Sequence, residues 1–226
     1  DHRDLHSFPT RRSSDPVAAV NDNGIGVSGV AGGGNGFSGI ELMSCQVFTS
    51  GGGGFAESYA YAADNGAVIS QNSWGYTNPG FFEQSVLDAI DYFIANAGYD
   101  AVGNPTGPMQ GGIVIFAAGN SDSDSDYYPG FYDPVLAVAS TNHNDQKAWY
   151  SNFGDWVDLS APGGETNFRS VEGVLSTYLS GSTAFLQGTS MACPHASGVA
   201  ALVLSHAGDN QLSNADMFNI MIESTD

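Results

Sequence analysis

Residues 188–195 read Gly188-Thr189-Ser190-Met191-Ala192-Cys193-Pro194-His195, a glycine turn that leads into small and apolar residues. The apolar run continues to Leu204 and predicts a helix with little bulk near its beginning. Pro194 fits the first turn of such a helix, because its missing amide donor is not needed there. Unpaired amides at a helix start favour negative charge, so Ser190 stands where an oxyanion is stabilised.

A second motif, Phe116-Ala117-Ala118-Gly119-Asn120-Ser121, precedes the first along the chain. Each motif alone has a structural reading: a helix N-cap for Ser190 and a turn at a strand end for Asn120. Together and in this order they resemble the nucleophile and oxyanion motifs of the subtilisin-like serine peptidases, the subtilases. The resemblance implies a serine endopeptidase that forms an acyl-enzyme on Ser190. It assigns the tetrahedral oxyanion to the Asn120 amide and the Ser190 N–H.

Further segments extend the resemblance. Ser73-Trp74-Gly75 resembles the family's substrate strand, which binds extended peptide through backbone hydrogen bonds. The implied substrate site consists of Ser73, Trp74, Gly75, Ala117, Ala118 and Gly119, around a roomy and uncharged pocket for an apolar side chain. Gly51–Gly54 stands where the opposite substrate strand is expected, with a flexible loop as the alternative. The segment 158–163 resembles a structural turn of the family.

The triad partners of Ser190 are not recognisable. In subtilases the segment that 17–31 resembles follows a histidine motif of the type HGTHVAG, itself preceded by a strand ending in the triad aspartate. His2 and His6 lack the flanking glycines of that motif, and His195 lies on the same helix as Ser190, directed away from its hydroxyl. We therefore expect a partial catalytic domain, truncated at both ends and inactive as given. The alternative is a non-catalytic subtilase homologue that binds peptide.

The first fifteen residues, DHRDLHSFPTRRSSD, differ in composition from the rest of the chain. They contain Arg3, Arg11 and Arg12 and show no helix or strand periodicity. The string resembles translated sequencing-adapter sequence, so we expect residues 1–15 to be a non-native segment and 16–226 to be the partial subtilase domain. A disordered basic arm is the alternative.

Composition narrows the function classes. The formal net charge is -19, which disfavours nucleic-acid binding through phosphate contacts. The chain has no apolar run long enough to span a membrane, which takes about 18 residues. Cys45 and Cys193 are predicted to be free and buried. The expected partner is a peptide or protein substrate, no cofactor is required for the chemistry, and the family together with the acidity suggests secretion or the cell surface.

A structural calcium ion is the one metal that the sequence suggests. Val20, Asp22, Ile25 and Val27 fall where many subtilases wrap a loop around calcium with carbonyl and side-chain oxygens. Here the loop is one residue longer, and a solvated Asx turn around Asp22 is the equal alternative. The run 122–126 is interpreted as a solvated acidic loop.

The middle of the chain alternates strand and helix patterns. Apolar runs predict strands at 40–48, from 67, and at 113–118, 135–139 and 157–159, and helical spacing predicts helices at 55–65 and 82–97. Near-continuous apolar strands between helices indicate a mostly parallel central sheet covered on both faces, an α/β three-layer sandwich. Ser73 and Asn120 are expected at the carboxyl ends of the strands, where such sheets bind ligands.

Overall fold

The computed structural model describes residues 15–24, 26–36, 38–48, 54–209 and 212–225. The prediction that residues 1–15 are non-native therefore lies almost wholly outside the described residues. Asp15 alone is described, as the first residue of the short helix α1 (Asp15–Ala18).

The centre of the molecule is a four-stranded parallel sheet with the strand order β1-β3-β4-β5. The strands are β1 (Ile69–Asn72), β3 (Ile113–Ala117), β4 (Leu136–Thr141) and β5 (Leu159–Pro162). All five residues of β3 are buried, as expected for a parallel strand covered on both faces. The predicted parallel sheet is confirmed.

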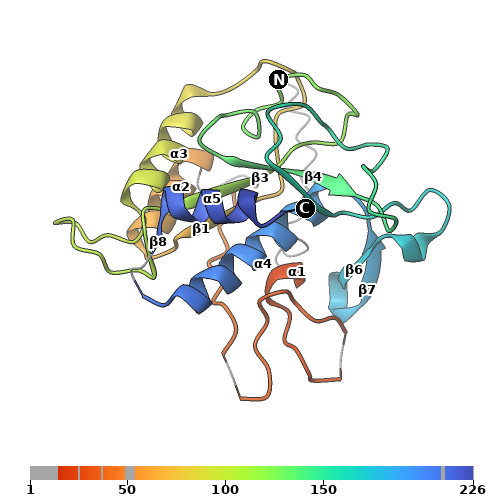
Figure 1. Cartoon of the computed structure of the whole chain (residues 1–226), viewed down its shortest axis with the longest axis horizontal. Helices are drawn as coiled ribbons and strands as arrows, with labels where there is room; N and C mark the ends of the chain where they lie inside the picture. The colour runs from red at the N-terminus through yellow and green to blue at the C-terminus, as the bar shows by residue number, and fades with distance from the viewer. Residues whose placement is uncertain (1–14, 25, 37, 49–53, 210–211, 226) are drawn as a thin grey trace.

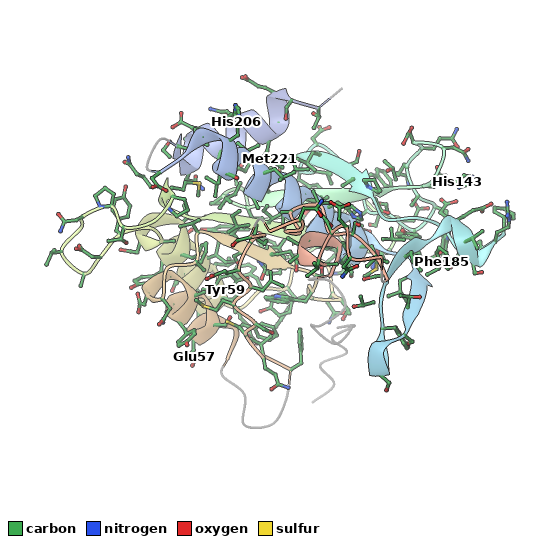
Figure 2. The ribbon with its side chains drawn as sticks, turned by 90° about the horizontal axis from the view of Figure 1, so that it is seen from below. Glu57, Tyr59, His143, Phe185, His206 and Met221 are labelled. Atoms are coloured by element: carbon green, nitrogen blue, oxygen red, sulfur yellow. The ribbon has the colours of Figure 1, made fainter. Side chains whose placement is uncertain are left out.

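Helices cover both faces of this sheet (Figure 1). Figure 2 shows α4 (Thr189–Ala207) and α5 (Asn214–Glu223), which carry His206 and Met221, on one side of the strands. Helix α2 (Phe55–Asp64), which carries Tyr59, lies on the other side, packed against α3 (Gln84–Asn96). These elements form the three layers of an α/β sandwich.

Two small sheets and two short helices complete the described fold. Strand β2 (Met109–Gln110) pairs in parallel with β8 (Leu212–Ser213). Strand β6 (Val174–Thr177) pairs antiparallel with β7 (Thr183–Leu186), and the 3-10 helices η1 (Ser170–Glu172) and η2 (Leu179–Gly181) flank β6.

The core explains why α4 begins with small residues. Ala192, Ala196 and Ala200 are fully or almost fully buried in one cluster with Phe116 of β3, so α4 lies close to the sheet. A Cβ atom added at Gly198 would meet Val30 Cβ at 2.6 Å. The small-residue stripe therefore sets the distance at which α4 packs.

The structure corrects three sequence expectations. Residues 40–48 form no strand, and Leu42 and Met43 are 53% and 40% exposed, because a cavity separates this segment from the outer edge of β1. Pro194 lies in the second turn of α4 and not in the first, since the helix begins at Thr189. Cys193 is buried, but Cys45 is only half-buried because it borders the same cavity.

Candidate active site

Ser190 lies in the first turn of α4, directly after the turn at Gly188. Gly188 has φ 142°, in the region that favours glycine. In a helix the N–H of residue 194 would donate to the carbonyl of residue 190, but Pro194 has no N–H. The Ser190 carbonyl instead accepts a hydrogen bond from the Ser73 hydroxyl at 2.9 Å. The proline thus leaves an acceptor through which the end of β1 is tied to Ser190.

Asn120 follows the end of β3 and contacts the first residue of α4. Its Oδ1 accepts from the Thr189 N–H at 2.9 Å and from the Thr189 hydroxyl at 3.0 Å. The Gly119 N–H in turn donates to Thr189 Oγ1 at 3.2 Å. These contacts bring Asn120 and Ser190 together, as the order of their motifs predicts, although the role of each residue stays a prediction.

Two hydrogen-bond donors remain unused at this junction. Within the part of the chain that the structure describes, neither the Ser190 N–H nor Asn120 Nδ2 donates to a protein acceptor. The N-terminus of α4 adds its positive end at the same point. Such an arrangement suits a small anion or a developing oxyanion.

A buried loop after β4 forms hydrogen bonds with the turn before Ser190 and with the segment around Asn120. The Tyr150 hydroxyl accepts from the Gly188 N–H at 2.8 Å and donates to the Gly164 carbonyl at 2.6 Å, and burial raises the pKa of this phenol. Asn152 Nδ2 donates to the Ala118 carbonyl at 2.8 Å, and Asn152 Oδ1 accepts from the Ser121 N–H at 2.8 Å. Sequence reasoning missed both residues, because polar residues in a loop carry no signal of long-range contacts.

No described histidine forms a hydrogen bond with Ser190. His195 Nδ1 lies 2.7 Å from the Met191 carbonyl one turn earlier in α4, in line with the expectation that it is a helix residue. His143 and His206 are exposed. His2 and His6 lie outside the described residues. Cys193 is fully buried, and burial raises the pKa of its thiol to about 11, which favours the protonated thiol.

The predicted substrate residues lie on two neighbouring elements. Ser73 and Trp74 follow β1, and the Trp74 ring packs on Phe55 at 4.1 Å and Phe116 at 5.3 Å between centroids. Ala117 and Ala118 are buried. Of the remaining predicted residues, Gly75 lies close to the backbone carbonyl of Tyr128, and Gly119 is half-buried. Gly54 caps α2, whereas 51–53 lie outside the described residues.

The loop predicted to bind calcium offers few oxygen atoms that could act as metal ligands. Asp22 has φ 57°, and its carboxylate accepts from Asn35 Nδ2 at 2.8 Å. Asn21 Oδ1 is buried without a hydrogen-bond partner among the described residues. No cluster of three or more His, Cys, Asp or Glu suited to a metal occurs in the described part of the chain. Amide and carboxylate oxygens match the preference of calcium.

Comparison with known proteins places this geometry in a family. Residues 7–226 match the profile of the Subtilase family. The chain belongs to the subtilases. It is 33% identical to thermitase from Thermoactinomyces vulgaris, over 84% of this chain and 58% of thermitase. It is 30% identical to a thermophilic serine proteinase from Bacillus sp. (strain AK1), over 93% of this chain and 45% of the relative.

Solved structures agree with the fold. A protease from Pseudoalteromonas arctica PAMC 21717 superposes with a TM-score of 0.73 and 31% identity, over 95% of this chain and 63% of that one. The subtilase chain thus spans about half the length of the first sequence relatives. No helix in the described residues is long and apolar enough to cross a membrane.

Proposed function

We propose that this subtilase chain carries the nucleophile and the oxyanion hole of a serine endopeptidase. In this proposal the Ser190 hydroxyl attacks a peptide carbonyl, and the Ser190 N–H and Asn120 Nδ2 stabilise the oxyanion of the tetrahedral intermediate. The observation that carries the proposal is that Asn120 Oδ1 accepts two hydrogen bonds from Thr189, one from its N–H and one from its hydroxyl. This contact occupies the amide oxygen and leaves Nδ2 as a donor beside Ser190.

The substrate is an extended peptide. Ser73-Trp74-Gly75 is the proposed pairing strand, and backbone pairing accepts many sequences because every peptide has the same backbone groups. Ala117, Ala118 and Gly119 are small and uncharged, so the residue before the scissile bond is proposed to be apolar. The acidic composition and the family support secretion or cell-surface location as part of the same proposal.

Labelling with a fluorophosphonate tests the nucleophile. We expect no labelling of Ser190 in the chain as given, because a serine hydroxyl needs a neighbouring base and the described residues place no histidine at Ser190. Joining an HGTHVAG-type segment and its upstream aspartate to residue 16 should restore labelling. Labelling of the chain as given would show that another base serves Ser190. Peptide binding without labelling in either form would favour the non-catalytic homologue.

The oxyanion role is tested by Asn120→Ala in the extended, active form. Loss of one oxyanion donor lowers turnover about 10²–10³-fold in subtilisin-type enzymes, and we expect a loss of that size with KM nearly unchanged. Asn96→Ala, at an exposed asparagine near the end of α3, is the matched control and should leave both constants unchanged. A mutant that keeps most of its turnover refutes the role of Asn120.

A structural calcium ion at the loop around Asp22 is proposed as a support of the fold and not of the chemistry. Asn21 Oδ1, which is buried without a protein partner among the described residues, and the Asp22 carboxylate are the oxygens that would hold it. Calcium chloride should raise the melting temperature of the chain more than magnesium chloride does, and Asp22→Ala should abolish the difference. Equal effects of both salts in both forms would contradict the site.

A further inference from the structure

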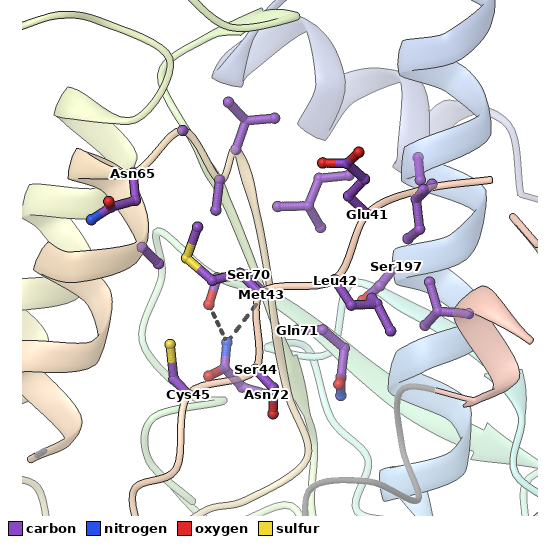
Figure 3. Close-up of a pocket in the computed structure, with 18 of the residues that line it drawn as sticks. Glu41, Leu42, Met43, Ser44, Cys45, Asn65, Ser70, Gln71, Asn72 and Ser197 are labelled. Carbon is purple, nitrogen blue, oxygen red and sulfur yellow. Dashed lines mark hydrogen bonds between the residues drawn. The ribbon is translucent and has the colours of Figure 1, made fainter. Parts of the chain in front are cut away.

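Four aromatic rings form a continuous row at the surface of the molecule, outside the cavity beside β1. That cavity is bordered by Leu42, Met43 and Gln71 (Figure 3), and none of the four rings lines it. The ring centroids of neighbours in the row are 5.0, 5.4 and 5.7 Å apart. In order, the aromatic row consists of Phe82, Tyr128, Phe131 and Trp156.

Three connections of the fold supply these rings. One ring lies between β1 and α3, two lie between β3 and β4, and one lies between β4 and β5. The Gly80 N–H donates to the Asp126 carbonyl at 2.8 Å, and Trp156 Nε1 donates to the Asp124 carbonyl at 3.1 Å. Phe82 is 43% exposed, and the other three rings are half-buried. The row is thus held by hydrogen bonds between the connections and is partly open to solvent.

The margin of the aromatic row is acidic. Asp124, Asp126 and Asp155 are exposed. The Asp124 side chain begins beside the Trp156 indole, because a Cβ atom added at Gly154 would lie 3.6 Å from Asp124 Cβ and 3.0 Å from Trp156 Nε1. An acidic side chain and an aromatic ring therefore stand side by side at one end of the row.

Further carboxylates lie next to Phe131. The hydroxyl of the following residue, Tyr132, donates to the carboxylate oxygens of Asp91 at 2.9 and 3.0 Å. Burial, this hydrogen bond and the negative charges of Asp91, Asp88 and Asp133 raise the pKa of Tyr132 to about 12. Negative charge is thus concentrated beside the middle of the aromatic row.

The neighbouring loops already hold one cation between a ring and a carboxylate. Lys147 Nζ lies 5.0 Å from the centroid of the Phe153 ring and 2.6 Å from Asp122 Oδ1. Arg169, the other Lys or Arg among the described residues, is paired at the start of η1. Both described basic side chains are therefore engaged elsewhere, and the aromatic row has a surplus of negative charge around it.

We propose that the aromatic row is a docking surface for an arginine-rich segment of an extended peptide. Cations are attracted to the faces of aromatic rings, and a guanidinium group also stacks on rings and pairs with carboxylates. Side chains on one face of an extended segment recur about every 7 Å, a spacing of the same order as that of the rings. Successive arginines can therefore contact the whole row, whereas a small cation covers only part of it. The surface acts independently of the proposed chemistry at Ser190.

Calorimetric titration of the chain with the capped peptide Gly-Arg-Gly-Arg-Gly-Arg-Gly-amide tests the proposal. The matched control peptide has lysine in place of each arginine, so it carries the same charge without a planar group that stacks. In about 150 mM sodium chloride, where the screening length is about 8 Å, we expect one site per chain. The arginine peptide should bind about fivefold more tightly than the lysine peptide. Equal binding would mean general attraction to a chain of net charge -19, and either this result or no binding overturns the proposal.

Substitutions that keep apolar bulk test the rings. Phe82→Leu and Trp156→Leu each remove one aromatic face from the row, and Phe168→Leu removes an 86% exposed ring outside it. We expect each variant of the row to bind the arginine peptide about two- to fivefold more weakly than the parent chain. Phe168→Leu should bind like the parent chain. Equal affinities in all forms contradict the docking surface. If Trp156→Leu does not fold, Phe82→Leu still decides.

The acidic margin is tested by a pair of variants with the same change in net charge. Asp124→Asn removes a carboxylate beside Trp156, and Glu223→Gln removes an exposed one at the end of α5. We expect binding of the arginine peptide to weaken about twofold in Asp124→Asn and to stay unchanged in Glu223→Gln. An equal loss in both variants would assign the binding to the overall charge of the chain and refute a local surface.

Discussion

Pro194 shows how one missing hydrogen-bond donor shapes the site. Because residue 194 has no N–H, the Ser190 carbonyl lacks its helical partner, and the Ser73 hydroxyl takes that place at 2.9 Å. The contact joins residues that are 117 positions apart. It also joins the proposed substrate strand to the proposed nucleophile, so a displacement of Ser73 is expected to displace Ser190 as well.

The first prediction concerns this contact. Ser73→Ala should lower the free energy of unfolding by about 1 kcal/mol, since it leaves the Ser190 carbonyl without a donor. In a Pro194→Ala background the new N–H supplies that donor, and the same Ser73→Ala change should cost less than half as much. Urea unfolding of the four forms measures the coupling. Equal losses in both backgrounds would show that the Ser73 hydroxyl does not stabilise the fold through Ser190.

At the scale of elements, α4 packs closely against the sheet because the residues that face it have small side chains. Ala192, Ala196 and Ala200 are buried, and Gly198 lies so close to Val30 that a Cβ would meet it at 2.6 Å. Helix propensity alone favours alanine over glycine by about 1 kcal/mol. Packing against the segment after α1 opposes that preference, because interiors tolerate extra atoms poorly.

Gly198→Ala should therefore destabilise the protein by about 1–3 kcal/mol despite the better helix propensity of alanine. Adding Val30→Ala to the variant removes the obstructing atoms and should recover part of the loss. Ser205→Ala, at an exposed position of the same helix, serves as the control and should change stability by less than about 0.5 kcal/mol. Thermal and urea unfolding report the differences; a stabilised Gly198→Ala would mean that α4 is more loosely packed than described.

The whole molecule is dominated by one sign of charge. With 24 acidic residues against 5 basic ones the net charge is -19, and the described residues contain two salt bridges, Lys147 to Asp122 and Arg169 to Glu172. Surface pairs of this kind contribute little, about 0–1 kcal/mol each. Self-repulsion over the whole surface is therefore the larger electrostatic effect on stability.

Salt should consequently stabilise this protein. Raising sodium chloride from about 10 mM to about 100 mM shortens the screening length from roughly 30 Å to roughly 10 Å, and the melting temperature should rise over this range. Tetramethylammonium chloride at equal ionic strength separates screening from specific sodium binding and should give the same rise. An unchanged or lower melting temperature would show that repulsion between the carboxylates does not limit stability.

The sequence by itself determined what depends on local pattern. Helical spacing predicted α2 and α3, apolar runs predicted β3 and β4, and two short motifs indicated the family and brought Ser190 and Asn120 into one site. These features can be predicted because periodicity and turn chemistry act between residues that are close along the chain.

Only the tertiary structure decided the features that depend on distant neighbours. The apolar segment 40–48 looks like a buried strand but forms no ladder, because pairing needs a partner edge at hydrogen-bond distance and a cavity lies between it and β1. Tyr150 and Asn152 look like loop residues, yet they support the turns at Gly188 and Asn120. Burial and backbone contact arise from the packing of remote segments, for which a single sequence carries no local signal.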